Sequence, residues 1–327
     1  MDTTLIELIN LKKYFPTGSG ILHAVDDVNL QIKKGKTLGV VGESGCGKST
    51  LGRTIIRLLD STDGKIILNG EDITRVKGKQ LAEVRQKMQM IFQDPYSSLD
   101  PRKTVSEAVS EPLLVSRKYK KGEVQDAIQE LMDLVGIDKR LRSSYPHELD
   151  GGRRQRVGIA RALALNPQFI VCDEPVSALD VSIQAQVLNL LKRLQMQREL
   201  TYMFVTHDLS VVRHISDEIC VMYLGQVVEM CPSKELFKRP IHPYTRALLE
   251  AIPSVDITRK HKRELLRGEI TSPINPKPGC RFAARCKYAC DKCHEPQTIR
   301  EIEKGHFVTC CRAEEVGEIV IHTRLEG

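Results

Sequence analysis

The chain has 327 residues, of which 41% are hydrophobic and 28% are charged. This balance is typical of a globular protein and excludes disordered, collagen-like and coiled-coil chains. The net charge is +7, but the basic residues are spread along the chain and form no tract typical of a nucleic-acid-binding arm. We therefore expect no nucleic acid among the partners.

The N-terminal residues lack the basic and apolar segments of a secretion signal. No apolar run approaches the roughly 18 residues that a membrane helix needs. We expect a cytosolic chain whose contact with a membrane, if it makes one, is peripheral.

Strands and helices alternate along most of the chain. Residues 1–11 and 21–32 alternate apolar and polar side chains around a Pro-Thr-Gly-Ser-Gly turn, which predicts an antiparallel hairpin. The other expected strands cover 37–42, 65–73 (a pair), 168–175, 201–206 and 218–230 (a pair), and the expected helices cover 48–59, 181–198 and a stretch after Asp208. Strands that alternate with helices favour an α/β fold with a mostly parallel sheet covered on both faces.

Two regions depart from this alternation. Residues 104–165 carry helical spacing, for example at Val124, Ile128, Leu131 and Val135, which predicts a helical insertion. After Pro253 the sequence becomes charged, then Pro-rich, and then rich in cysteine. We place a boundary near residue 255, which divides the chain into a domain over 1–255, with a helical subdomain over about 96–165, and an extension over 256–327.

A phosphate-binding loop follows the apolar run 37–42. The stretch from Gly42 to Thr50 fits the pattern G-x-x-x-x-G-K-[ST] between a strand and a helix, where backbone N–H groups wrap a polyphosphate. Lys48 is expected to reach the β- and γ-phosphates, and Ser49 to ligate Mg²⁺. The nucleotide-binding residues of the loop are Gly42, Ser44, Gly45, Cys46, Gly47, Lys48, Ser49 and Thr50.

A second buried strand ends in two acids, Asp173 and Glu174. It brings them to the same edge of the sheet as the phosphate loop. Asp173 is expected to hold Mg²⁺ through the water shell of the ion, and Glu174 to orient or deprotonate the attacking water. The sequence therefore predicts a nucleoside triphosphatase.

These motifs resemble, in order and spacing, those of the ATP-binding subunits of ABC transporters, over residues 5–255. The resemblance implies a P-loop cassette with an antiparallel β subdomain and a helical subdomain. It also implies that Gln93 senses Mg²⁺ and water and links the site to membrane subunits, that His207 contacts the γ-phosphate, and that Asp180 lies at a dimer seam. An aromatic side chain stacks on adenine in this family; we choose Phe15, with Tyr14 as the alternative.

The signature of the family usually reads Leu-Ser-Gly-Gly-Gln, and this chain departs from it. Asp150, Gly151, Gly152 and Arg153 follow Leu149, and the segment is expected to reach the nucleotide held by a partner cassette. Asp150 can still cap the helix, but an ionised carboxylate cannot donate a hydrogen bond to a γ-phosphate. In one interpretation, the positive charge of Arg153, which lies one helical turn after Asp150, offsets the negative charge of Asp150. The alternatives are an altered composite site and a benign variant.

Three stretches, over 92–102, 211–225 and 239–253, look like the oligopeptide/dipeptide branch of importers, and more like the second of its two ATPase subunits. The resemblance implies ATP hydrolysis that drives peptide import from the cytoplasmic face of the membrane. The implied partners are a second ABC ATPase subunit, in a heterodimer or in a homodimer in isolation, two permease subunits and an extracytoplasmic substrate-binding protein. The alternatives are an importer of nickel or another metal chelate, and a non-transport ABC ATPase.

Six of the ten cysteines fall between residues 280 and 311. Four thiolates suit either tetrahedral zinc or a [4Fe–4S] cluster. The extension resembles that of the peptide-importer ATPases, in some of which it holds an iron–sulfur cluster. We rank a cluster first, zinc second and free thiols third, and the resemblance implies the ligands Cys280, Cys286, Cys293 and Cys310. Cys290 and Cys311 are spare thiols, either of which could replace its neighbour.

Overall fold

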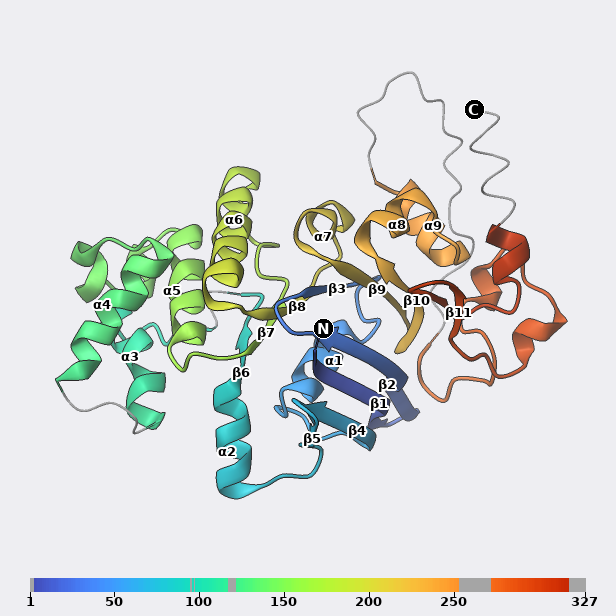
Figure 1. Cartoon of the computed structure of the whole chain (residues 1–327), viewed down its shortest axis with the longest axis horizontal. Coiled ribbons are helices and arrows are strands. Elements are labelled where there is room, and N and C mark those ends of the chain that lie inside the picture. The colour runs from blue at the N-terminus through green and yellow to red at the C-terminus, as the bar shows by residue number, and fades with distance from the viewer. Residues whose placement is uncertain (1–2, 95, 97, 117–121, 253–271, 318–327) are drawn as a thin grey trace, which may run out of the picture.

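The computed structural model describes residues 3–94, 96, 98–116, 122–252 and 272–317. Its centre is an eight-stranded sheet in the order β11-β12-β10-β9-β3-β8-β7-β6 (Figure 1). Neighbouring strands from β9 to β6 are parallel, as the sequence predicts, and the other pairs are antiparallel. The bounds are β3 (Thr37–Val41), β6 (Met88–Ile91), β7 (Phe169–Asp173), β8 (Thr201–Val205), β9 (Glu218–Tyr223), β10 (Gln226–Pro232), β11 (Arg300–Glu303) and β12 (His306–Val308).

Every residue of β3, β7 and β8 is buried. This explains their continuous apolar sequence, because a parallel strand in the middle of a sheet is covered on both faces.

The predicted hairpin is confirmed and belongs to a second, antiparallel sheet in the order β2-β1-β4-β5. Its strands are β1 (Thr4–Thr17), β2 (Gly20–Lys33), β4 (Asp63–Leu68) and β5 (Glu71–Asp72). Apolar side chains of β1 and β2 form one core with helix α1 (Lys48–Ile55) and one face of the central sheet. The antiparallel sheet therefore closes the core beside the phosphate loop.

Nine α-helices lie among the described residues, and three of them form the predicted helical subdomain. In Figure 1, α3, α4 and α5 stand together at the β6 side of the central sheet. Their apolar faces share one core with α6 and the strands behind it. The bounds are α1 (Lys48–Ile55), α2 (Gly78–Lys87), α3 (Val105–Ser116), α4 (Glu123–Val135), α5 (Gly151–Leu163), α6 (Val181–Arg198), α7 (Leu209–Ile215), α8 (Ser233–Lys238) and α9 (Pro243–Glu250).

Helix α1 is shorter than the sequence predicts, since it ends at Ile55 and not near Leu59. Arg57 adopts a left-handed backbone conformation, with φ of 58°. Its guanidinium, almost fully buried, donates hydrogen bonds to the carbonyl of Ile73 and to the carboxylate of Asp60. These contacts with a later turn stop the helix one turn early.

The sequence patterns missed five elements, namely α2, α8, α9, β11 and β12. Helices α8 and α9 have six and eight residues, which is too short for a clear helical periodicity. Helix α2 buries only Val84, so its amphipathic pattern is weak. Strands β11 and β12 have four and three residues, and β11 is almost wholly exposed, so they lack the alternation that marks longer strands.

The described part of the extension continues the central sheet. Strand β12 pairs with β10, with Val308 opposite Glu229. The fully buried carboxylate of Glu229 accepts the backbone N–H of Ile241 at 2.8 Å and of His242 at 3.0 Å, and lies 2.7 Å from Nε2 of His306. The boundary that we predict near residue 255 lies outside the described residues and stays a prediction.

The buried His242 predicts a pH-dependent loss of stability. Its Nδ1 accepts the backbone N–H of Tyr244 and caps α9, and burial lowers the pKa of its imidazole to about 4. In the unfolded chain the pKa is about 6.5, so below pH 6.5 the unfolded state gains a proton that the folded state refuses. The free energy of unfolding should fall by up to about 3 kcal/mol between pH 6.5 and pH 4 from this group.

Denaturant unfolding at several pH values measures this loss. His242→Asn keeps an acceptor for the Tyr244 N–H but cannot titrate, so its stability should fall less steeply below pH 6.5 than that of the parent. His147→Asn, at an exposed histidine, is the control and should follow the parent. Equal slopes for His242→Asn and the parent would show that this explanation is wrong.

Candidate ATP-binding and hydrolysis site

The phosphate loop joins β3 to α1, where the sequence places it. Gly47 is the N-cap of α1 and has a φ of 103°, which is strained for residues with a side chain. A Cβ on Gly47 would lie 2.0 Å from the carbonyl oxygen of Ala24 in β2. Glycine is required at this position both by the backbone conformation and by the close approach of β2.

Lys48 lies beneath the loop and is only 5% exposed. Its Nζ donates to the carbonyls of Gly42 at 2.8 Å and Glu43 at 2.9 Å. Cys46 has its Sγ 3.7 Å from the same Nζ, and burial raises the pKa of its thiol. Lys48 thus holds the strand end of the loop from below. The predicted residues Gly42 to Gly47 form the loop, and Lys48, Ser49 and Thr50 form the first turn of α1.

Ser49 and Asp173 come together although 124 residues separate them in the chain. Ser49 Oγ donates to Asp173 Oδ1 at 2.6 Å, and Arg53, one turn further along α1, places Nη2 3.5 Å from Asp173 Oδ2. A hydroxyl and a carboxylate are the hard oxygen donors that Mg²⁺ prefers. The pair therefore fits the predicted Mg²⁺ site, and Arg53 is a neighbour that the sequence analysis did not identify.

Glu174 joins two residues that the sequence placed at the ends of other strands. Gln93 follows β6 and donates Nε2 to Glu174 Oε2 at 2.9 Å. His207 follows β8 and has Nδ1 3.2 Å from Glu174 Oε1. Glu174 itself has a φ of 45°, an uncommon conformation for a residue other than glycine that clusters at functional sites. The three side chains meet at the carboxyl edge of the sheet.

Asp150 caps α5, as the sequence predicts. Its carboxylate accepts the backbone N–H of Arg153 at 2.7 Å, and its other oxygen lies 3.4 Å from Arg153 Nε. Both side chains are more than half exposed. The charge of Asp150 is thus paired within its own helix turn.

The glycines after Asp150 pack against the start of α6. A Cβ on Gly152 would lie 2.6 Å from Cγ2 of Ile183, and one on Gly151 would lie 3.1 Å from Leu179. Asp180 is the exposed N-cap residue of α6. The signature segment and Asp180 therefore belong to one surface of the chain.

The two candidate adenine-stacking residues differ in their contacts. Tyr14 stacks on the ring of His23, with 3.9 Å between centroids, and donates its hydroxyl to Asp26. Phe15 has Nζ of Lys13 4.8 Å from its ring centroid. Because the ring and hydroxyl of Tyr14 are already engaged, these contacts favour Phe15.

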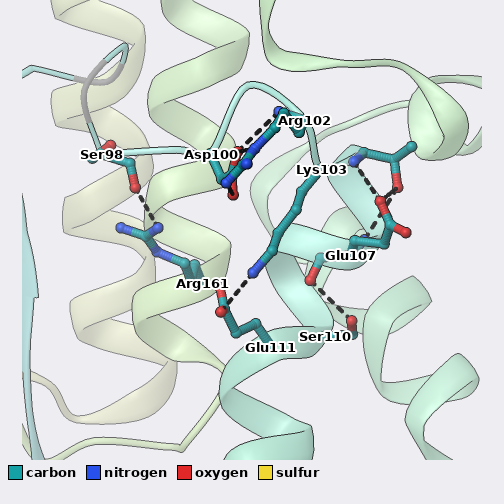
Figure 2. Close-up of polar contacts among 9 residues, drawn as sticks. Ser98, Asp100, Arg102, Lys103, Glu107, Ser110, Glu111 and Arg161 are labelled. Carbon is teal, nitrogen blue, oxygen red and sulfur yellow. Dashed lines mark hydrogen bonds and ion pairs between the residues drawn. The ribbon is translucent and has the colours of Figure 1, made fainter.

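The segment after Gln93 is tied to α5, whose first residues carry the signature. Figure 2 shows Arg161, near the end of α5, donating to the carbonyl of Ser98, and Lys103 Nζ pairing with Glu111. The guanidinium of Arg154, also on α5, lies 3.7 Å from the ring centroid of Tyr96. The contacts of Arg161 and Arg154 thus join the segment after Gln93 to the signature helix, and Lys103 joins it to α3.

The six cysteines of the extension form two overlapping groups. The small cavity beside His242 and Phe282 is lined by the four cysteines that the resemblance implies as ligands, namely Cys280, Cys286, Cys293 and Cys310. No three of these four bring their sulfurs within 4.8 Å of one another. The second group does so, with Sγ–Sγ distances of 3.9 Å for Cys290 and Cys293, 4.0 Å for Cys290 and Cys311, and 3.7 Å for Cys293 and Cys311.

The contacts that hold the loop from outside were missed by the sequence analysis. The hydroxyl of Tyr244 accepts the backbone N–H of Glu43 at 2.8 Å, and Arg285 of the extension pairs with the carboxylate of Glu43. A possible signal was the arginine that directly precedes Cys286, but nothing in the sequence indicates its partner.

This fold and this set of side chains define a P-loop ATPase cassette of the ABC type. Residues 25–177 match the ABC transporter family, and residues 228–293 match the C-terminal region of oligopeptide/dipeptide transporters. The dimeric, post-hydrolysis structure of the ATP-binding cassette MJ0796 bound to ADP and Pi is similar, with a TM-score of 0.64 and 31% identity over 70% of this chain and 99% of that one.

Curated relatives match over nearly the whole chain. The oligopeptide transport ATP-binding protein AppF of Bacillus subtilis is 50% identical over 321 residues, which cover 94% of this chain and 97% of AppF. OppF of Salmonella typhimurium is 48% identical over 322 residues, covering 95% and 96%. The chain belongs to the ABC transporter ATPases, and within them to the group of oligopeptide transport ATP-binding proteins. The predicted fold class is confirmed for the cassette and its two subdomains.

Replacing Glu174 tests the arrangement at the sheet edge. Glu174→Gln keeps the size of the side chain but removes the carboxylate that can accept a proton, so ATP hydrolysis should fall by about 100-fold or more. Affinity for Mg-ATP should change by no more than about threefold, because Lys48 and the Ser49–Asp173 pair remain.

Phosphate release and equilibrium nucleotide binding, measured on the full-length chain in its complex, separate the two effects. Glu199→Gln, at an exposed residue that ends α6, is the matched control and should hydrolyse ATP like the parent. Retention of more than a tenth of the activity by Glu174→Gln would contradict this assignment.

Proposed function

We propose that the chain is the ATP-hydrolysing subunit of an ABC importer of oligopeptides. The observation that carries the proposal is the meeting of Lys48, the Ser49–Asp173 pair and the Glu174 group at one sheet edge. The names of the relatives supply the cargo, since AppF and OppF are oligopeptide transport ATP-binding proteins.

The geometry supports a direct role for each group. The loop N–H groups and Lys48 bind the phosphates, while Ser49 and Asp173 hold Mg²⁺. A water attacks the γ-phosphorus, its proton passes to the carboxylate of Glu174, and ADP leaves. Gln93 and His207 contact the two oxygens of Glu174 and so orient the carboxylate. In the proposed mechanism His207 also contacts the γ-phosphate.

The exposed signature surface supports association with a second cassette. Asp150 and Asp180 lie on the outside of the chain, where they can complete a site on a partner. The related cassette MJ0796 has a dimeric structure. In the proposed complex the partner is a second ABC ATPase subunit, and the Asp150–Arg153 pair lowers the repulsion between Asp150 and the nucleotide of that partner.

The helical subdomain offers a surface for membrane subunits. None of the described helices is long and apolar enough to cross a membrane. Tyr96, Leu114 and Val115 are 63%, 57% and 77% exposed, and Tyr96 lies three residues from Gln93. Large contiguous apolar patches mark interaction sites, and we propose that these side chains contribute to one. In the proposed complex this surface meets two permease subunits at the cytoplasmic face of the membrane, and a substrate-binding protein delivers peptides on the other side.

Recovery of the tagged full-length chain from detergent-solubilised membranes tests this function. A second ABC ATPase and two permease subunits should accompany it in equal amounts, and Glu174→Gln should abolish uptake of a labelled tetrapeptide by cells that carry the complex. A chain recovered without any membrane protein, or peptide uptake unaffected by Glu174→Gln, would refute the proposal.

We propose that the cavity lined by Cys280, Cys286, Cys293 and Cys310 holds a [4Fe–4S] cluster and not a single zinc ion. In tetrahedral zinc with Zn–S of about 2.3 Å, the sulfurs lie only about 3.8 Å apart, whereas these four surround a space. Burial raises the pKa of the Cys280, Cys286 and Cys310 thiols, so they need a cation nearby to become thiolates. A bound cluster would supply that charge and cross-link a segment with little apolar core.

The competing zinc site is the second group. A triangle with edges of 3.7–4.0 Å has its centre about 2.2 Å from each sulfur, close to a Zn–S bond. Both sites need Cys293, so one chain holds either the cluster or this zinc.

Two matched variants distinguish the sites. The full-length chain purified without oxygen should be brown, with about four irons per chain. Cys280→Ser should lose the iron, and Cys290→Ser, which removes a member of the second group only, should keep it. Stoichiometric zinc without iron, lost in Cys290→Ser but kept in Cys280→Ser, would reject the cluster in favour of the zinc site.

A further inference from the structure

The segment between Cys280 and Cys286 extends two arginines from the extension into the cassette. We propose that Arg281 and Arg285 are positioning residues of the ATP site, through which the order of this cysteine-bearing turn and the affinity for ATP are coupled. The inference rests on the proposed nucleotide site and adds to it a regulatory contact from the extension.

Arg285 holds the phosphate loop through Glu43. Its Nη1 donates to Glu43 Oε2 at 2.8 Å and its Nη2 to Glu43 Oε1 at 3.2 Å. The side chain of Arg285 is 7% exposed and that of Glu43 is 23% exposed. Bidentate pairs between arginine and carboxylate fix both distance and orientation. The contact therefore sets where the second residue of the loop lies.

The backbone of Glu43 is held as well. Its N–H donates to the Tyr244 hydroxyl, and its carbonyl accepts Lys48 Nζ. The ring of Tyr244 packs edge-on against Tyr223, which in turn packs against Phe282 of the extension turn. Glu43 is thus fixed at three points, two of which depend on the packing of the extension.

Arg281 acts on the other side of the loop. Its guanidinium donates to Asp26 Oδ2 and to the carbonyl of Leu224. Asp26 also accepts the Tyr14 hydroxyl and lies 3.1 Å from His23 Nδ1.

Two residues before Asp26, the carbonyl of Ala24 lies directly against Gly47. The backbone N–H of Gly225, the residue after Leu224, donates to the Cys46 carbonyl at 2.8 Å. Arg281 therefore fixes the two segments that support the phosphate loop.

Electrostatics gives Arg285 a function beyond packing. Glu43 places a negative charge in the loop that must receive a polyphosphate. With Arg285 paired to it, that charge is compensated and turned away from the phosphates. Without Arg285, an unpaired and partly buried carboxylate would repel the nucleotide, and loss of one partner of such a pair has a large cost.

The coupling to the extension follows from the chain itself. Arg281 directly follows Cys280, and Arg285 directly precedes Cys286. The turn between them is short and bonded, with Cys280 N–H donating to the Cys293 carbonyl at 2.8 Å and Cys286 N–H to the Ala283 carbonyl at 3.2 Å. Any interaction that orders this turn therefore also orders both arginines and so favours nucleotide binding. Because such coupling is reciprocal, nucleotide binding must favour the ordered turn by the same free energy.

The first test uses full-length Glu174→Gln as the parent, so that hydrolysis does not interfere, and measures the dissociation constant for Mg-ATP. Adding Arg285→Met should raise this dissociation constant about tenfold or more. Adding Glu43→Gln to that variant should return the constant to within about threefold of the parent, because no uncompensated charge remains. Arg285→Lys should lie between these values. Arg300→Met is the control, since Arg300 pairs with Glu314 inside the extension, and it should bind like the parent.

The rescue by Glu43→Gln separates this role from a merely structural one, because a loop disordered by loss of packing would not recover when a second contact is removed. A dissociation constant for Arg285→Met within twofold of the parent, or a double variant as weak as Arg285→Met, would overturn the proposal. Failure of the parent itself to bind Mg-ATP would instead refute the proposed function.

A second measurement tests the coupling in the opposite direction. Saturating Mg-ATP should slow backbone hydrogen exchange in the turn 280–286 of the parent, and this protection should be at least halved when Arg281→Met and Arg285→Met are present. Exchange in the turn that is indifferent to Mg-ATP in the parent would overturn the coupling.

Discussion

The chemistry of this chain depends on the register of three parallel strands. In the ladder, Val40 of β3 lies opposite Val205 of β8, and Asp173 of β7 lies opposite the same Val205. The phosphate loop, the acid pair and His207 follow the ends of these strands, so all three reach one edge of the sheet. Because every residue of these strands is buried, a slip in register would disrupt the packing on both faces of the sheet as well as separate the site. The core therefore holds the catalytic geometry.

The extension is attached to the cassette by charged and polar groups as much as by apolar packing. Glu229, Arg281 and Arg285 are all nearly or fully buried, and each finds its partners in a segment remote from it in sequence. Buried ion pairs add little net stability, but breaking one is costly. Such contacts fix where two units lie relative to each other, which suits an extension whose position matters to the phosphate loop.

The two cysteine groups of the extension differ in the spacing of their sulfurs. Four sulfurs around a cavity suit a cluster, and three sulfurs within 4.0 Å of one another suit a single ion. Cys293 belongs to both groups. The proposed cluster and the competing zinc ion would therefore both need this thiol, and the turn that carries Arg281 and Arg285 lies between two of the four cysteines proposed for the cluster, Cys280 and Cys286.

The sequence by itself determined the elements whose signals are local. The phosphate loop, the acid pair after an apolar run, the bounds of α6 and the cap at Asp150 each follow from residues a few positions apart, and the structure has them as predicted. Family resemblance then placed Gln93 and His207 near Glu174, because strands that end at one edge bring their following residues together. The order of strands and motifs along the chain could therefore identify which residues form the site, but it could not give the distances between them.

Only the tertiary structure decided the features that join distant residues. The early end of α1 depends on the contact of Arg57 with Ile73. The short strand β12 is held by pairing with β10, and β11 by pairing with β12. Arg285 lies 242 residues from Glu43, and Arg281 lies 255 residues from Asp26. A pair so far apart leaves no periodicity or spacing in the sequence, since its partners meet only when the sheet is complete. The choice between Tyr14 and Phe15, and the division of the cysteines into two groups, likewise depend on which side chains the fold brings within a few ångströms.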